Sequence, residues 1–310
     1  MKLSIVTTLY QSAPYVAEFY ARTSSVAQQL VGEDYEIVFV NDGSPDNSLE
    51  VAVKLTQDSH VIVVDLSRNF GHHKAMMTGL AHAQGDLIFL IDSDLEEEPE
   101  WLLSFADQMA KESCDVVYGV QEKRRGNWFE RWSGEIFYCL FRYLTGINYP
   151  SNIVTARVMT RRYVDALLHH KEREVLIGGL WHITGFNQLP QDVKKHSTSQ
   201  TTYTFLKKFS VFFNAIISFS YMPLIVIFNI GITIFFGSLL YVFYIILLWA
   251  FLNKVVDGWT SIMASIWLLG GIMISFIGII GIYLAKIFSE TKQRPLTIIR
   301  HVYGQCRTSY

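Results

Sequence analysis

Two long stretches without a charged residue constrain this chain more than any other feature. They cover residues 209–253 and 258–285, which are 45 and 28 residues long. A helix that crosses a bilayer needs about 20 predominantly apolar residues, so each stretch is long enough to span a membrane. The sequence therefore predicts two transmembrane helices within residues 223–288, joined by a short turn.

The charged residues are divided unevenly along the chain. Residues 1–202 contain 18 Lys and Arg against 26 Asp and Glu, whereas residues 203–310 contain 8 against 2. This division predicts an acidic globular domain followed by a membrane anchor, and it argues against a nucleic-acid partner. Lys254 is the only Lys or Arg between the two apolar stretches, so the positive-inside rule places both ends of the chain in the cytoplasm. We expect a multi-pass protein of the inner (cytoplasmic) membrane with a cytoplasmic catalytic domain.

Residues 1–120 alternate between short apolar runs and helical patterns. Continuous apolar runs of this kind are typical of parallel strands that are covered on both faces. The pattern predicts an α/β fold with a doubly wound, mostly parallel sheet, whose ligands bind beyond the carboxyl ends of the strands. The expected strands are 3–9, 36–40, 61–66, 86–92 and 115–120, and the expected helices are 15–30, 46–58, 72–84 and 99–112.

Two further segments combine aromatic and basic residues. Residues 127–147 are rich in Trp, Tyr and Phe, and they predict either a helix that covers the core or an interfacial helix that lies on the bilayer. Residues 203–222 predict an amphipathic juxtamembrane helix before the first span. After the second span, residues 289–310 are expected to form a basic cytoplasmic tail.

Two aspartates stand at the end of a predicted buried strand. Side chains of an extended segment repeat every two residues, so Asp92 and Asp94 are expected on one side. Two carboxylates held close repel each other unless a cation lies between them, and Mg²⁺ or Mn²⁺ suits such oxygen ligands. The alternative is that these acidic residues only begin the helix at 99–112. We interpret the following acidic residues Glu97, Glu98 and Glu100 as capping or solvated.

Polar loops also follow two other predicted strands. Residues 41–46 form either a turn that caps the next helix or a contact surface for a ribose or base. Arg68 and Lys74 place positive charge beside a loop-to-helix junction, where free helix N–H groups favour phosphate. We interpret His72 and His73 as solvated or phosphate-edge residues rather than metal ligands.

Four segments in this order resemble the family 2 glycosyltransferases with a GT-A fold. They are TTLYQSAPYV, NDGSPDNS, LSRNFGHHKAMMTGLAHAQGD and DSDLEEEPE. The closer resemblance is to the polyprenyl-phosphate branch, which includes bactoprenol glucosyltransferases, undecaprenyl-phosphate aminoarabinose transferases and dolichol-phosphate mannose synthases. It continues through residues 218–224 and 278–295 and covers nearly the whole chain.

The resemblance implies a membrane-bound inverting enzyme. It would transfer a sugar from a nucleotide sugar, by default a UDP-hexose, to polyprenyl (undecaprenyl) phosphate, and its lipid-linked monosaccharide would serve cell-envelope glycan modification. The implied cofactor is Mg²⁺ or Mn²⁺, held by Asp92, Asp94 and Glu96. The implied catalytic residues are Asp94 and Arg157. The residues expected to bind the nucleotide sugar are Thr8, Tyr10, Asp42, Ser44, Arg68, Lys74 and Asp92. Those expected to bind the acceptor phosphate are Arg124, Arg157, Lys194, Lys195 and His196.

The chain departs from the family pattern at several positions. Gln121 stands where relatives usually have Arg, Thr155 where many have Asp, and Thr202 where a Lys is usual. These changes leave open a non-catalytic membrane scaffold derived from this fold. A processive polysaccharide synthase-like transferase is a second alternative, because it would share the same early motifs. A QxxRW signature, expected of the processive synthase, is missing from the sequence. Small residues that would permit close packing of the spans in a homo-oligomer are Gly270, Gly271, Gly278 and Gly281.

Overall fold

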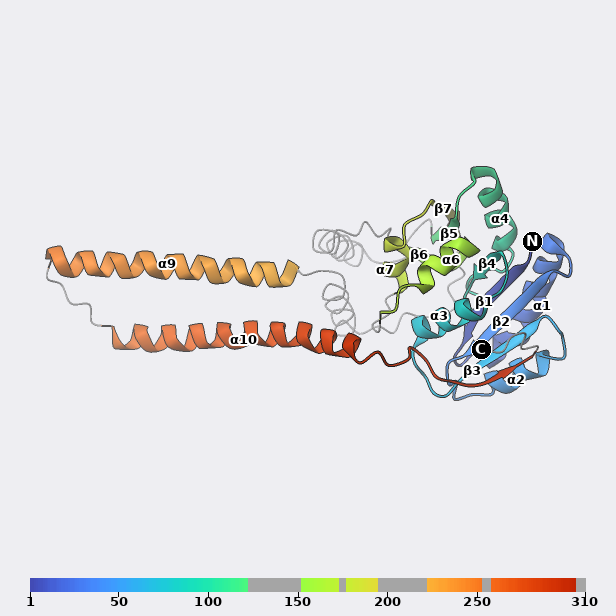
Figure 1. The fold of residues 1–310 in the computed structure, drawn as a ribbon, viewed down its shortest axis with the longest axis horizontal. Helices are drawn as coiled ribbons and strands as arrows, with labels where there is room; N and C mark the ends of the chain where they lie inside the picture. The colour runs from blue at the N-terminus through green and yellow to red at the C-terminus, as the bar shows by residue number, and fades with distance from the viewer. Residues whose placement is uncertain (122–151, 173–176, 195–221, 253–257, 305–310) are drawn as a thin grey trace. The chain divides into compact units, whose positions relative to one another are not determined.

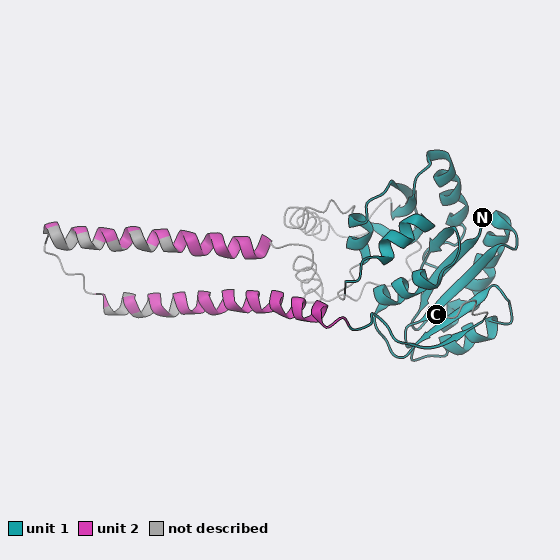
Figure 2. Ribbon diagram, viewed as in Figure 1, with its two compact units in different colours: residues 1–140, 147–203, 294–310 teal, residues 141–146, 204–293 magenta. Residues whose placement is uncertain are grey.

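The computed structural model of the chain forms two compact units (Figure 2). The first unit comprises residues 1–140, 147–203 and 294–310, and the second comprises residues 141–146 and 204–293. The residues that the structure describes are 1–121, 152–172, 177–194, 222–252 and 258–304.

An eight-stranded sheet organises the described part of the first unit (Figure 1). Its order is β7-β5-β6-β4-β1-β2-β3-β8. Parallel pairs join β1 to β2 and β4, β2 to β3, and β5 to β7, whereas β6 and β8 run antiparallel to their neighbours. The predicted α/β, mostly parallel sheet is therefore confirmed. The strands are β1 (Leu3–Leu9), β2 (Tyr35–Asn41), β3 (Val61–Leu66), β4 (Leu87–Leu90), β5 (Val116–Gln121), β6 (Ile153–Thr160), β7 (Gln188–Val193) and β8 (Ile299–Tyr303).

Helices cover both faces of this sheet, which explains why its central strands are continuous apolar runs. One buried cluster joins the sheet to α1, α2 and α4 through residues such as Phe19 and Phe105. A second cluster on the opposite face includes Met76 of α3, Tyr163 of α6 and Leu180 of α7. All seven residues of β1 are buried. The helices are α1 (Ala13–Val31), α2 (Ser48–Leu55), α3 (His72–His82), α4 (Trp101–Glu112), α6 (Arg161–Leu168) and α7 (Ile177–Ile183).

Two antiparallel strands were not expected from the sequence. Strand β6 lies between β4 and β5, and it separates strands that neighbour each other along the chain. Strand β8 pairs with β3 at the edge of the sheet (Figure 1). Residues 289–310, predicted as a basic tail, thus contain the end of a long helix and an edge strand of the eight-stranded sheet.

The second unit contains two long helices, α9 (Met222–Leu252) and α10 (Trp259–Thr291). Within the described residues, one helical stretch is long and apolar enough to cross a membrane, Leu269–Thr291, with a mean hydropathy of 2.1 and none of its window buried. A shorter apolar stretch covers Met222–Ile234. One of the two predicted spans is thus matched by length and composition, and the second stays a prediction. The predicted interfacial segments, 127–147 and 203–222, lie outside the described residues apart from Met222.

Candidate active site

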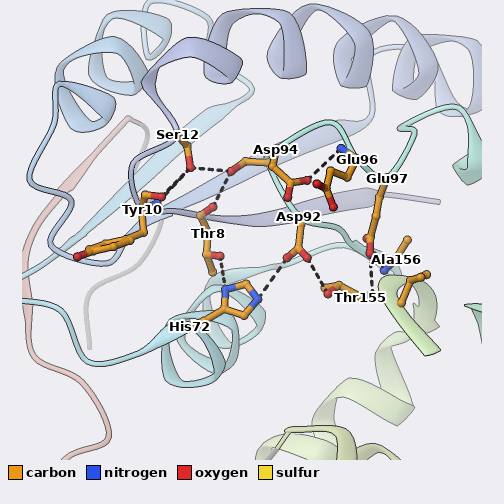
Figure 3. Close-up of polar contacts among 12 residues, drawn as sticks. Thr8, Tyr10, Ser12, His72, Asp92, Asp94, Glu96, Glu97, Thr155 and Ala156 are labelled. Atoms are coloured by element: carbon orange, nitrogen blue, oxygen red, sulfur yellow. Dashed lines mark hydrogen bonds and ion pairs between the residues drawn. The ribbon is translucent and has the colours of Figure 1, made fainter. Parts of the chain in front are cut away.

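The polar residues singled out in the sequence meet at one edge of the sheet. Strands β1, β2, β3 and β4 run parallel, so their carboxyl ends lie at the same edge. Strand β6 runs the opposite way and brings its first residues there. Side chains from the strand ends and from the start of α3 therefore converge (Figure 3).

Asp92 lies at the centre of a chain of polar contacts (Figure 3). Thr155 of β6 donates its Oγ1 hydrogen to Asp92 Oδ2 at 2.8 Å. His72 Nε2 lies 3.3 Å from Asp92 Oδ1, and His72 Nδ1 shares a hydrogen bond of 2.9 Å with Thr8 Oγ1. These contacts join β1, α3, β6 and the segment after β4. Thr8 and Asp92 lie at this edge, where the sequence pattern predicted them, whereas the contacts of His72 and Thr155 with them were not predicted.

His72 lies between Thr8 and Asp92 and is only partly exposed. Its side chain is 47% exposed. Burial lowers the pKa of His72, but the hydrogen bond to Asp92 and the negative charges nearby outweigh that effect and raise this pKa above its ordinary value. The interpretation of His72 as a solvated or phosphate-edge residue was therefore incomplete, because one ring nitrogen faces Thr8 and the other faces Asp92.

Asp94 and Glu96 belong to a tight turn rather than to an extended strand end. Strand β4 ends at Leu90, and the backbone N–H of Glu96 donates to Asp94 Oδ1 at 3.0 Å. Leu95 between them has a left-handed φ of 59°, which is unusual for a bulky residue. Its side chain packs against the core, which holds the turn in place. In the described part of the chain, no three His, Cys, Asp or Glu side chains are grouped as a metal centre.

Glu97 is the most deeply buried acidic residue of this turn. Its side chain has no exposed surface. Its two carboxyl oxygens accept the backbone N–H groups of Thr155 at 2.9 Å and Ala156 at 2.8 Å. The prediction of a capping or solvated Glu97 was wrong, because the antiparallel strand β6 supplies two donors that the local sequence does not reveal. Glu97 fixes the start of β6 beside Asp92.

Asp42 locks together the loops that follow β2 and β3. It is 2% exposed, and its carboxylate accepts the backbone N–H groups of Phe70 at 2.7 Å and Gly71 at 3.0 Å. Burial raises the pKa of Asp42, although these hydrogen bonds oppose the rise. At Gly43, where φ is 60°, a Cβ atom would lie 2.4 Å from the backbone nitrogen of Asn69. Only glycine permits this close approach of the two loops.

Ser44 has a structural place in the turn after Asp42. Its Oγ donates to Asp46 Oδ1 at 2.5 Å and accepts the backbone N–H of Gln11 at 2.7 Å. Burial raises the pKa of Asp46, but hydrogen bonds from Ser44, Ser48 and Ala13 lower it to about 2. Ser44 therefore ties the loop after β1 to the loop after β2.

The remaining residues predicted to bind the nucleotide sugar surround this edge. Tyr10 is 49% exposed just after β1. Arg68 is exposed, and its guanidinium lies 4.1 Å from the centre of the Phe70 ring. Lys74 is half-buried in the first turn of α3.

Arg157 lies in β6, two residues beyond Thr155, and is only 1% exposed. Its guanidinium covers the ring of Trp181 and donates to the backbone carbonyls of Thr155 at 3.2 Å and Val154 at 3.3 Å. In this structure Arg157 orders the start of β6, so an acceptor phosphate would reach its guanidinium only after a local rearrangement.

Few of the other predicted acceptor-phosphate residues fall in the described part of the chain. Lys194 is exposed immediately after β7. Arg124, Lys195 and His196 lie outside the described residues. Gln121 ends β5, and its backbone N–H donates to the carbonyl of Asn152.

Comparison with known proteins identifies the class of enzyme. Residues 4–168 match the model of "Glycosyl transferase family 2". Over 310 residues, the chain is 49% identical to a protein of Mycobacterium tuberculosis (strain CDC 1551 / Oshkosh) named "Putative glycosyltransferases", covering 100% of this chain and 90% of that protein. YkcC of Bacillus subtilis (strain 168), described as an uncharacterized glycosyltransferase, is 34% identical over 308 residues, which cover 98% of this chain and 95% of YkcC. The chain belongs to glycosyl transferase family 2 and is a glycosyltransferase.

Solved structures to which this chain is similar include Staphylococcus aureus TarS, residues 1–349, in complex with UDP-GlcNAc. The TM-score is 0.48 at 18% identity, and the match covers 70% of this chain and 66% of that chain. Mannosyl-3-phosphoglycerate synthase from Rubrobacter xylanophilus has a TM-score of 0.47 at 16% identity, with 70% of this chain and 72% of that chain covered.

Proposed function

We propose that this glycosyltransferase moves a hexose from a nucleoside diphosphate sugar, by default a UDP-hexose, to polyprenyl phosphate at the cytoplasmic face of a membrane. The observation that carries the proposal is the convergence of Asp92, Asp94 and the Asp42 loop at the carboxyl edge of the sheet. Ligands of open α/β sheets bind at this edge. The product would be a lipid-linked monosaccharide for modification of cell-envelope glycans.

The carboxylate side chains at this edge suit a divalent cation. Asp92 and Asp94 offer hard carboxylate oxygens within one turn, and Glu96 lies beside Asp94 (Figure 3). Mg²⁺ is commonly bound through one or two carboxylates together with substrate phosphates and water. This mode does not require three protein ligands to be grouped in advance. Bound Mg²⁺ or Mn²⁺ would stabilise the charge that develops on the departing nucleoside diphosphate.

The chain's own residues supply positioning. His72 and Thr155 orient Asp92 from two sides. The Asp42 carboxylate holds the N–H groups of the loop before α3, and Arg68 and Lys74 add positive charge around the start of that helix. A helix N-terminus with adjacent cations favours a phosphate group. We assign the nucleotide and diphosphate to this region.

The charge of a lipid phosphate and the apolar stretch Leu269–Thr291 support the proposed acceptor class. A phosphate monoester has a second pKa near 6, so polyprenyl phosphate is largely a dianion at pH 7. Such a nucleophile attacks the anomeric carbon directly, with inversion and without a general base, which allows Thr155 to stand where many relatives have Asp. The unburied apolar stretch Leu269–Thr291 supports an acceptor that resides in the membrane. Lys194, with Lys195, His196, Arg124 and Arg157, would supply positive charge for its phosphate.

Transfer to a defined lipid tests this proposal. The full chain is purified in detergent and incubated with undecaprenyl phosphate and a panel of UDP-sugars, with Mn²⁺ or with EDTA, and the lipid product is identified by mass spectrometry. We expect one UDP-hexose to give product only with the metal, and Asp94→Ala to lose at least about 100-fold in rate. Asp107→Ala is the matched control, since Asp107 is 61% exposed in a surface ion pair. Equal rates for the wild type and Asp94→Ala would overturn the metal role, and transfer to a non-lipid acceptor alone would overturn the acceptor class.

A further inference from the structure

The segment that follows helix α10 contributes to the catalytic sheet. Residues 297–303, which we call the C-terminal strap, contain β8 and run antiparallel to β3. The carbonyl of Ile298 accepts the backbone N–H of Ser67 at 2.8 Å. Thr297 Oγ1 shares a hydrogen bond of 2.7 Å with Thr78 Oγ1 of α3. The strap therefore contacts both the end of β3 and the helix whose first residue faces Asp92.

Arg300 makes the most informative contacts of the strap. Its Nη1 lies 3.3 Å from Asp65 Oδ2, and its Nη2 donates to the carbonyl of Ser67 at 2.6 Å. Asp65 is only 1% exposed, and its other oxygen accepts a hydrogen bond from Asn41 Nδ2 at 2.8 Å. A buried carboxylate requires such partners. The guanidinium of Arg300 thus reaches, through Asp65, the residue that directly precedes Asp42.

These contacts surround the loops that form the proposed donor pocket. Ser67 begins the loop whose N–H groups at Phe70 and Gly71 bind Asp42. Asn41 accepts the backbone N–H of Ser44 in the neighbouring turn. The strap lies beyond residues 4–168, which match the family model. A segment outside the matched family domain therefore contacts and supports the loops that are proposed to bind the sugar donor.

We propose that the C-terminal strap positions the donor pocket, and that Arg300 is a positioning residue for nucleotide-sugar binding through Asp65 and Asn41. The inference rests on the proposed function, because it requires a donor at this edge. The side chain of Arg300 is 58% exposed, so its contribution to the stability of the fold is screened by solvent. We expect Arg300 instead to position the loops that follow β2 and β3, which it reaches through Asp65 and Ser67.

Substitutions at Arg300 separate positioning from simple stabilisation. Arg300→Met is compared with Arg300→Lys and with Arg294→Met, which removes an equal charge from an exposed position. We expect Arg300→Met to raise the KM for the sugar donor about tenfold, or about 1.4 kcal/mol, with kcat and the acceptor KM changed less than about twofold. Lysine keeps the charge but not the forked geometry, so Arg300→Lys should recover part of the loss. A donor KM equal to that of Arg294→Met would overturn the proposal.

A second variant and a binding measurement keep the test decisive. Thr297→Val removes only the hydroxyl that contacts Thr78, and it should raise the donor KM about threefold even if Arg300→Met fails to fold. Titration calorimetry with UDP and Mn²⁺ measures binding without turnover. If the wild type binds UDP and all strap variants bind it equally, the strap proposal fails alone. If the wild type binds no UDP, both the strap proposal and the proposed donor site fail.

Discussion

Glu97 offers the sharpest test of how the site is built. Both carboxyl oxygens accept backbone N–H groups of β6, and the side chain has no exposed surface. The isosteric change Glu97→Gln keeps the shape but replaces one acceptor oxygen by a donor. One of the two N–H groups, at Thr155 or Ala156, then loses its partner inside the protein.

The magnitude follows from these contacts. A hydrogen bond to a charged group contributes about 1.5–3 kcal/mol, and a buried donor without an acceptor costs a similar amount. For a domain of about 150–250 residues, 1 kcal/mol shifts the unfolding temperature by about 2–4 °C. We therefore expect Glu97→Gln to lower the unfolding temperature by about 3–12 °C. Transfer should slow as well, because Thr155 also holds Asp92.

The assay is thermal unfolding in detergent, followed by tryptophan fluorescence, with Glu100→Gln as the matched control. Glu100 lies three residues further along and pairs with Arg22 at 2.6 Å, but its side chain is 45% exposed. Surface ion pairs contribute about 0–1 kcal/mol. Equal unfolding temperatures for the Glu97 and Glu100 variants would refute the assigned role of Glu97.

Three further predictions concern neighbouring positions. Gly43→Ala should destabilise the fold by more than about 1 kcal/mol and weaken UDP binding in calorimetry, because its Cβ would meet the Asn69 backbone; unchanged binding would count against the loop contact. The pKa of Asp46 is lowered from 3.8 to about 2, so its stabilisation is present above about pH 4 and is lost as pH falls towards 2. The difference in unfolding temperature between the wild type and Asp46→Asn should therefore shrink as pH falls from about 4 to about 2; a constant difference would contradict this. His72→Ala should raise the Mn²⁺ concentration for half-maximal activity about 10–100-fold, as expected when a group that orients a metal ligand is lost, and an unchanged Mn²⁺ titration would remove His72 from the site.

The central strands were predictable because burial on both faces leaves an unbroken apolar run. Strand β1 was predicted with its observed bounds, since all its residues are buried. Strand β6 was missed because Thr155 and Arg157 interrupt its apolar pattern. Strand β8, with the sequence IRHVY, lacks a buried face, and its pairing with β3 joins segments more than 200 residues apart. Such pairings depend on tertiary contacts that no local pattern records.

In the candidate site, too, the local sequence pattern predicts some positions, whereas others depend on tertiary contacts. Residues after parallel strands, such as Asp42 and Asp92, could be placed at one edge from topology alone. Glu97 appears in a run of acidic residues that is typical of a solvated surface, and its burial depends on the arrival of β6. His72 gains its importance from contacts with Thr8 of β1 and with Asp92 in the segment after β4. Sequence spacing located the strand ends but not the contacts between them.

The central claim is that Asp92 and Asp94 hold a divalent ion against the diphosphate of a nucleotide sugar. An anomalous difference map from crystals of the full chain grown with UDP and Mn²⁺ tests it most directly. The account predicts one strong manganese peak within about 2.0–2.3 Å of a carboxylate oxygen of this pair and of a diphosphate oxygen. A manganese peak elsewhere, with UDP bound away from the Asp42 loop, would contradict it.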